Sequence, residues 1–173
     1  MNRMNASKPL VAAFALALAA APSGAIAAGG HGHGRGPMHG PNPRVDRIVG
    51  TWQTEVKLFP CEGGPDIASF LALGSFHAGG TLDNTDETPV TSRGPGTGIW
   101  KNEGHGQYRA RMQFMRYNAD GSYDGIQDIT RTLRMRHGGQ QMDETVVARV
   151  LNPDGSLRVT VCGEGTNWRV GLD

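Results

Sequence analysis

The sequence predicts an all-β domain built as an eight-stranded antiparallel up-and-down barrel. Glycine accounts for 26 of the 173 residues, which favours frequent turns over long helices. Four turn signals recur at a constant spacing of 17 residues, at Gly104, Gly121, Gly138 and Gly155. Strands of equal length joined by hairpins favour a closed barrel, because closure removes the unpaired edges of a sheet.

The turn signals divide the chain into eight expected strands, at about 47–58, 67–77, 80–85, 96–103, 106–117, 122–136, 140–151 and 156–170. Strand 106–117 alternates apolar and polar residues, which is typical of a strand with one buried face. In strand 122–136 the apolar positions change phase between Ile126 and Ile129, and a β-bulge there would account for the change.

Residues 1–27 have the features of a secretory signal peptide. Arg3 and Lys8 precede an apolar run of 12 residues, Leu10 to Ala21, which is too short to span a bilayer. Ala25-Ile26-Ala27 then supplies an A-x-A cleavage pattern, with cleavage expected after Ala27 or after Ala28. We therefore expect a β-barrel domain over 45–173 that is periplasmic or secreted and has no membrane span.

Residues 28–44 form a His/Gly/Pro-rich segment that we expect to be a flexible tether. It contains His31, His33 and His39. Cleavage after Ala28 would leave Gly29-Gly30-His31 at the N-terminus, and its amine, amides and imidazole would suit square-planar Cu(II) or Ni(II). Otherwise the segment predicts only weak metal binding, and no other cofactor is expected.

The charge balance argues against a nucleic-acid-binding protein. Without Arg3 and Lys8 the chain carries 15 basic and 16 acidic residues. A surface that follows phosphates needs clustered positive charge, so we expect no nucleic-acid partner.

Two positions at opposite ends of the domain resemble the signature of the lipocalins and the wider calycin barrels. Gly50-Thr51-Trp52 opens the first expected strand, and Arg169 lies on the last. In that family the arginine packs across the tryptophan and closes one end of the barrel, and a guanidinium stacks well on an indole face. The resemblance implies the same role for Trp52 and Arg169 in a calycin-like barrel.

The two cysteines provide an independent check on that pairing. If Trp52 faces Arg169 on antiparallel strands, the numbers of facing residues sum to about 221, and Cys61 and Cys162 sum to 223. The cysteines therefore fall nearly opposite each other, and in an exported protein they are expected to form a disulfide.

The domain also resembles a group of small exported bacterial proteins without an assigned activity. The likeness is carried by Gly50-Thr51-Trp52, Cys61, the segment 76–81, the segment 98–100 and Cys162. It implies a barrel but no particular ligand.

An eight-stranded barrel either holds one small ligand or is filled by side chains. We expect seven residues to line the interior as ligand-binding candidates, and Asp128 among them would need a buried partner such as Arg149 or Arg131. Phe70 and Leu73 both point inward only if a bulge separates them. The candidates are Phe70, Leu73, Trp100, Tyr108, Met112, Phe114 and Asp128.

The sequence contains neither a G-x-S-x-G nor an H-E-x-x-H pattern, and it gives no catalytic residues. Three functions remain open. The first is a non-enzymatic binder of a small apolar or amphipathic molecule. The second is an isomerase or cyclase like the allene-oxide-cyclase barrels, and the third is a structural or protein-binding module with a filled barrel. A deep apolar cavity with one paired polar group would favour the second, a cavity with no such group the first, and a filled interior the third.

Overall fold

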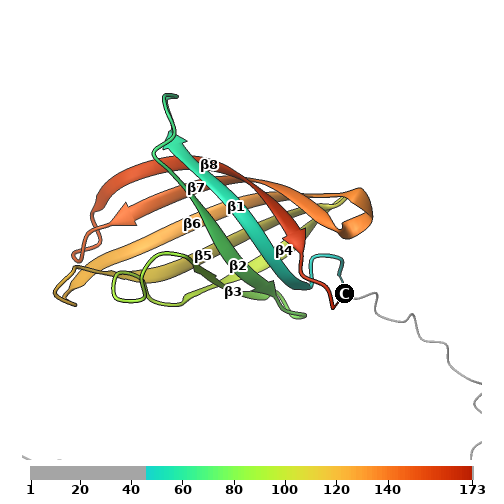
Figure 1. Cartoon of the computed structure of the whole chain (residues 1–173), viewed down its shortest axis with the longest axis horizontal. Helices are drawn as coiled ribbons and strands as arrows, with labels where there is room; N and C mark the ends of the chain where they lie inside the picture. The colour runs from blue at the N-terminus through green and yellow to red at the C-terminus, as the bar shows by residue number, and fades with distance from the viewer. Residues whose placement is uncertain (1–45, 173) are drawn as a thin grey trace, which may run out of the picture. The chain divides into compact units, whose positions relative to one another are not determined.

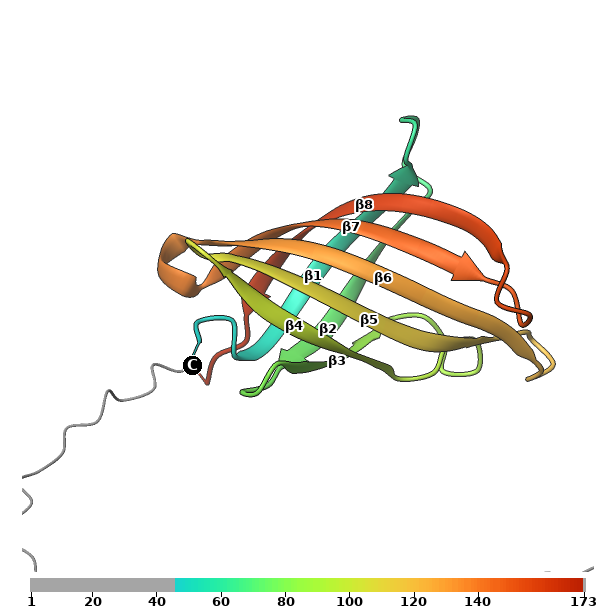
Figure 2. The same cartoon turned by 180° about the vertical axis from the view of Figure 1, so that it is seen from behind.

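The computed structural model describes residues 46–172 and confirms the predicted closed barrel of eight antiparallel strands (Figure 1). Neighbours in the sequence are neighbours in the barrel, and β8 pairs with β1 (Figure 2). Every expected strand is present, with its ends displaced by three residues at most. The strands are β1 (Gly50–Pro60), β2 (Ala68–Phe76), β3 (Thr81–Asp86), β4 (Gly96–Gly104), β5 (Gln107–Tyr117), β6 (Tyr123–Arg136), β7 (Gln141–Leu151) and β8 (Leu157–Arg169).

The expected signal peptide and tether, with His31, His33 and His39, lie outside the described residues. Between β6 and β7, at the turn signal of Gly138, the chain makes a short 3-10 turn, η1 (His137–Gly139). Within residues 46–172 no helix is long and apolar enough to cross a membrane.

The β5–β6 and β7–β8 hairpins are closed by the same type of turn. In the first, the Asn118 side chain donates to the Ser122 hydroxyl at 3.0 Å, and Asp120 accepts a bond from the Ser122 backbone at 2.9 Å. The second repeats these bonds at 2.9 and 2.9 Å with residues 152–156. The last glycine of each turn has a positive φ, 82° at Gly121 and 83° at Gly155, which is a conformation that glycine adopts without steric cost.

One end of the barrel is closed by the pair that the sequence predicted. Trp52 pairs with Arg169 across β1 and β8, and the guanidinium lies 4.3 Å from the centre of the indole ring. The Arg169 side chain also donates to the Val49 carbonyl at 2.9 Å and to the Gly139 carbonyl at 3.0 Å. One arginine therefore ties the start of β1 and the β6–β7 turn to the end of β8.

The short segment before β1 covers this end. Ile48 is fully buried, and its carbonyl accepts a 2.8 Å hydrogen bond from the Trp52 indole. The Tyr108 hydroxyl donates to Asp46 at 2.7 Å, and Asn102 donates to the same carboxylate at 2.8 Å. Burial, together with this bond, raises the pKa of Tyr108 to about 12, so the phenol remains a neutral donor.

Cys61 and Cys162 form the predicted disulfide near the other end of the same strand pair. Their Cα atoms are 4.9 Å apart, and the bridge spans 101 residues of sequence. In β1 and β8 the facing residues Phe59 and Cys162 keep the register of Trp52 and Arg169. A bridge of this kind contributes about 2–4 kcal/mol to stability.

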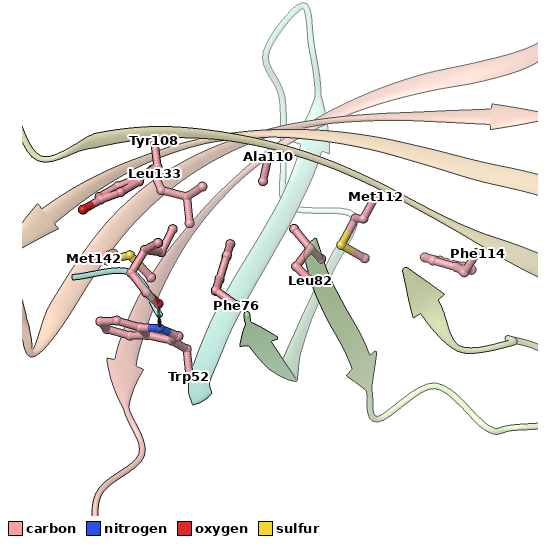
Figure 3. Packing of buried hydrophobic residues seen from close by; sticks show 10 residues of the cluster. Trp52, Phe76, Leu82, Tyr108, Ala110, Met112, Phe114, Leu133 and Met142 are labelled. Carbon is pink, nitrogen blue, oxygen red and sulfur yellow. Dashed lines mark hydrogen bonds between the residues drawn. The ribbon is translucent and has the colours of Figure 1, made fainter. Parts of the chain in front are cut away.

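The packed core fills the half of the barrel next to Trp52. Figure 3 shows Trp52, Met142, Leu133 and Tyr108 gathered at that end, whereas Phe114 lies at the far side of the cluster. Phe76, Leu82 and Ala110 occupy the middle and are 1–2% exposed. Such complete burial leaves no space for a ligand in this half.

The bulge that sets the inward-facing residues of β6 lies elsewhere than the sequence predicts. Met112 pairs with Ile129 and Tyr108 with Leu133, so the odd-numbered residues of β6 point inward. The register shift in this hairpin lies opposite Arg116 and Tyr117, which places the bulge before Ile126. The expected bulge between Ile126 and Ile129 is therefore wrong, and Ile126 pairs with the outward-facing Met115.

Candidate functional site

The half of the barrel away from Trp52 contains a pocket with mainly apolar walls. Its wall residues come from six of the eight strands, because the inward positions of β4 and β8 at this level include glycines. The wall consists of Val56, Leu58, Phe70, Ala72, Asn84, Asp86, Met112, Phe114, Gln127, Ile129, Val146 and Ala148. The pocket is about 50 Å³, room for a few water molecules and far less than the roughly 300–1,000 Å³ of sites for drug-sized molecules.

A buried polar network forms the floor of this pocket and separates it from the packed core. Arg131 and Glu144 are 5% and 4% exposed, and Thr54 lies beside them on the pocket wall. Arg131 Nε donates to Glu144 Oε2 at 2.9 Å, and Nη2 donates to the same oxygen. The two opposite charges neutralise each other inside the barrel, which is the condition under which a buried charge is tolerated.

Asn167 completes the network from β8. Its Oδ1 accepts bonds from Thr54 at 2.7 Å and from Arg131 Nη2 at 3.1 Å. Its Nδ2 donates to Glu144 Oε2 at 3.2 Å and to the Met142 carbonyl at 3.3 Å. The network thus connects β1, β6, β7 and β8 through side chains, and it holds the Arg131 guanidinium in a fixed orientation.

Gly165 makes room for this network. It pairs with Glu144 across β7 and β8. A Cβ at position 165 would lie 3.0 Å from Glu144 Oε1 and 2.9 Å from the Glu55 carbonyl. Any larger residue there would displace the carboxylate or the strand.

The structure places five of the seven interior candidates inside the barrel, in two different places. Phe70, Met112 and Phe114 line the pocket. Tyr108 belongs to the packed core, and the partly buried Trp100 packs against it. Their burial shows where these side chains lie, and whether a ligand contacts them remains a prediction.

Leu73 was expected inside and is outside. It is 48% exposed, because β2 keeps a strict alternation with Ala72 buried and no bulge separates Phe70 from Leu73. Leu73 lines a groove on the outer surface of the barrel instead.

Asp128 was also expected inside, and this too is wrong. It pairs with the exposed Gln113 on the outer face, and Arg111 donates two hydrogen bonds of 2.8 Å to its carboxylate. The Arg111 side chain covers Asp128 from solvent and, despite partial burial, holds the pKa of Asp128 below its usual value. Arg131, considered as a partner for Asp128, pairs with Glu144.

Sequence reasoning missed the polar floor and the buried Arg93. Glu144 left a signal, because it interrupts the apolar face of β7 between Met142 and Val146. A charged residue at an inward position predicts a buried partner. Finding Arg131 as that partner required the phase of β6, which the sequence left open.

No family model and no curated protein matches this sequence. One similar solved structure is the S-type phycobiliprotein lyase CPES from Guillardia theta, with 7% sequence identity and a TM-score of 0.36. The match covers 73% of this chain and 90% of that one. At this level the likeness bears on neither the fold nor the function, and the fold rests on the strand pairing described above.

Within residues 46–172 no three His, Cys, Asp or Glu side chains gather in a way that could hold a metal ion. His77 contacts Asp83 at 2.8 Å on the surface.

Breaking the Arg131–Glu144 pair tests whether the floor is a single unit. Glu144→Leu leaves a buried, unpaired guanidinium, and we expect it to lower the free energy of unfolding by about 3–5 kcal/mol. Arg131→Met should cost a similar amount. The double variant Arg131→Met/Glu144→Leu should recover most of the loss, measured by urea unfolding. Costs that simply add in the double variant would contradict a coupled pair.

Proposed function

We propose that this protein is a non-enzymatic binder of a small molecule with an apolar body and one hydrogen-bonding end. The observation that carries the proposal is the asymmetry of the barrel interior. One half is filled, and the other half has an apolar-walled pocket that ends on the Arg131–Glu144 pair. In this arrangement the apolar part of a ligand lies against Val146, Ala148 and Met112, and its polar end meets the floor.

The charges of the pocket favour a neutral ligand. Arg131 is balanced by Glu144, and Asp86 by Arg93 at 3.2 Å. An ionised ligand would bring an unbalanced charge into a buried space, at considerable cost. A hydroxyl, carbonyl or amide end therefore suits the floor better than a carboxylate or an ammonium group.

The floor is suited to orienting a ligand and not to moving its protons. Glu144 is bound to Arg131 and Asn167 through Oε2, which leaves Oε1 to accept a hydrogen bond from a ligand. Both carboxylates of the pocket, Glu144 and Asp86, are paired with arginines, and this suits a polar anchor better than the acid and base that proton transfer needs. A paired polar group at the end of an apolar pocket is the feature expected of an isomerase or cyclase, but this pocket is only about 50 Å³ and is not the deep cavity that would fold a reactive lipid. We therefore place binding ahead of an isomerase or cyclase activity.

Export is part of the proposal. It is supported by the signal-peptide features of residues 1–27 and by the Cys61–Cys162 disulfide, since such bonds persist in oxidising compartments.

Intact mass spectrometry of the protein from the periplasm or medium of an expressing bacterium checks this. We expect a chain that begins at Ala28 or Gly29 and that has lost two hydrogens at the cysteine pair. A full-length chain with reduced thiols would contradict export. A start at Gly29 would also produce the Gly-Gly-His terminus that suits Cu(II) or Ni(II).

Binding is tested with the straight-chain alcohols from butan-1-ol to octan-1-ol, followed by NMR of ¹³C-methyl methionine. Met112 lines the pocket, whereas Met142 lies in the packed core and Met115 is exposed on the outer face. We expect a saturable shift of the Met112 methyl signal alone. Affinity should rise about fourfold per added CH₂ until the pocket is full.

Two neighbouring substitutions give a matched control. Ala148→Leu fills the pocket and should abolish the Met112 shift. Val147→Leu introduces the same residue on the outer face of the same strand, where Val147 is 43% exposed, and it should leave binding unchanged. If no alcohol shifts Met112 in the folded wild type, the binding proposal is wrong, and the filled structural module takes its place.

A further inference from the structure

The barrel wall has a gap between β3 and β4. Their pairing ends at Asn84 and Gly96. Beyond that point β3 stays with β2 as far as Asp86. The segment before β4 stays with β5 instead, since the Gly94 amide donates to the Met115 carbonyl at 2.9 Å. The two sides of the gap therefore share no ladder of backbone hydrogen bonds.

The side chain of Arg93 fills this gap. Arg93 is 6% exposed, and its guanidinium lies 4.1 Å from the centre of the Phe114 ring. Nη2 donates to Asn84 Oδ1 at 2.8 Å, and Nε lies 3.2 Å from Asp86 Oδ2. Asn84 in turn donates to the Leu73 carbonyl at 3.2 Å. Side-chain bonds thus replace the missing backbone ladder.

The Arg93 side chain separates the inner pocket from a groove on the outer surface. Inside is the pocket, whose wall at this point is Asn84, Asp86 and Phe114. Outside is a groove of about 690 Å³. Arg93 and Asn84 line the groove together with the exposed apolar side chains of Leu73 and Val90.

The Arg93 side chain is held less firmly than its burial suggests. Arg93 Nε is buried without a well-aligned hydrogen bond, although the Asp86 carboxylate is close. Burial lowers the pKa of Arg93, and the nearby Asp86 offsets this only in part. A buried cation with an unused donor gains hydration when it swings out into the groove, and the gap that it leaves lets water reach the Asp86 carboxylate, which offsets the loss of the ion pair.

We propose that Arg93 is a movable stopper in the barrel wall and that the outer groove is the first docking site for the ligand on its way into the pocket. This rests on the proposed binding function. The groove suits the same neutral, largely apolar molecule, because Leu73 and Val90 offer it apolar surface. When Arg93 swings out, the gap leads from the groove to Met112 and Phe114.

Met112 gives a readout of the open wall that needs no ligand. It is 3% exposed, and a Cβ built at Gly96 would lie 3.2 Å from its methyl carbon and 3.1 Å from Arg93 Nη2. The methyl group and the stopper are therefore neighbours behind β4. Peroxide oxidises accessible methionines to the sulfoxide, and peptide mass spectrometry measures the rate at each position.

The experiment compares the wild type with Arg93→Ala and Arg93→Met. The second variant keeps an apolar stem over Phe114 and guards against a loss of folding in the first. In both we expect Met112 to oxidise about tenfold faster, because the wall no longer has to open. Met142 should stay protected and exposed Met115 should be unchanged. Arg111→Met, which removes an Arg–Asp pair elsewhere on the outer surface, is the matched control and should behave as the wild type.

The same variants are then titrated with hexan-1-ol, and exchange rates are taken from the Met112 line shape. We expect association and dissociation to accelerate together, about tenfold, with a change in Kd of less than about threefold. Unchanged oxidation of Met112 in both Arg93 variants would show that Arg93 is no stopper. Faster oxidation with unchanged hexan-1-ol rates would overturn the route through the gap. If the wild type binds no alcohol, the proposed function fails, and with it the role of the groove, while oxidation still reports the stopper.

Discussion

The pairing of β1 with β8 in a single register is the constraint on which the rest of this structure depends. It joins the first strand of the domain to the last. Trp52 faces Arg169 at one end of this strand pair, and Phe59 faces Cys162 near the other. Since side chains alternate along a strand, this one register decides which residues of both strands point inward. A slip of either strand by one residue would turn Thr54 or Asn167 outward and break the Thr54–Asn167 bond of the polar floor.

Closure also explains why the barrel is unequal along its length. At the Arg169 end, the segment that contains Ile48 folds over the opening, and Arg169 binds its carbonyls. The space there is taken up by aromatic and long apolar side chains. In the other half of the barrel, the inward positions of β8 and β4 are glycines instead of large side chains, which leaves a pocket. These glycines are Gly163 and Gly165 on β8 and Gly96 and Gly98 on β4.

The polar floor has an energetic cost that an apolar floor would avoid, since buried ion pairs are often no better than well-packed hydrophobic residues. Its bonds reach β1, β6, β7 and β8. A network of this kind fixes the relative positions of its strands and offers a ligand a polar group of defined orientation. Fixed strand positions would serve any barrel, whereas an oriented polar group facing a pocket is of use to the proposed binding function.

Turn residues at regular spacing predict the strands, and the resemblance to the lipocalin barrels implies the pair of Trp52 and Arg169. The register of that pair brings Cys61 and Cys162 nearly opposite each other, so the strands, the closure pair and the disulfide could be predicted from the sequence. The orientation of Leu73 could not, because β2 carries large apolar residues on both faces, Leu71 and Leu73 outside and Phe70 and Phe76 inside.

The inward-facing side of β6 could not be predicted for the same reason, because both faces carry charged residues: Asp128 lies on the outer face and Arg131 on the inner face. Arg93 precedes β4 in a segment whose sequence shows no periodicity, and its burial follows from the gap between β3 and β4. Such a residue is found only when the pairing of both strands is known.

A crystal structure under xenon pressure tests most directly whether the barrel interior is filled at one end and open at the other, because xenon enters small apolar cavities without needing a specific ligand. We expect xenon in the pocket, in contact with Met112, Val146 and Ala148, and none among Trp52, Leu133 and Met142. An empty pocket, or xenon in the packed half, would contradict this expectation.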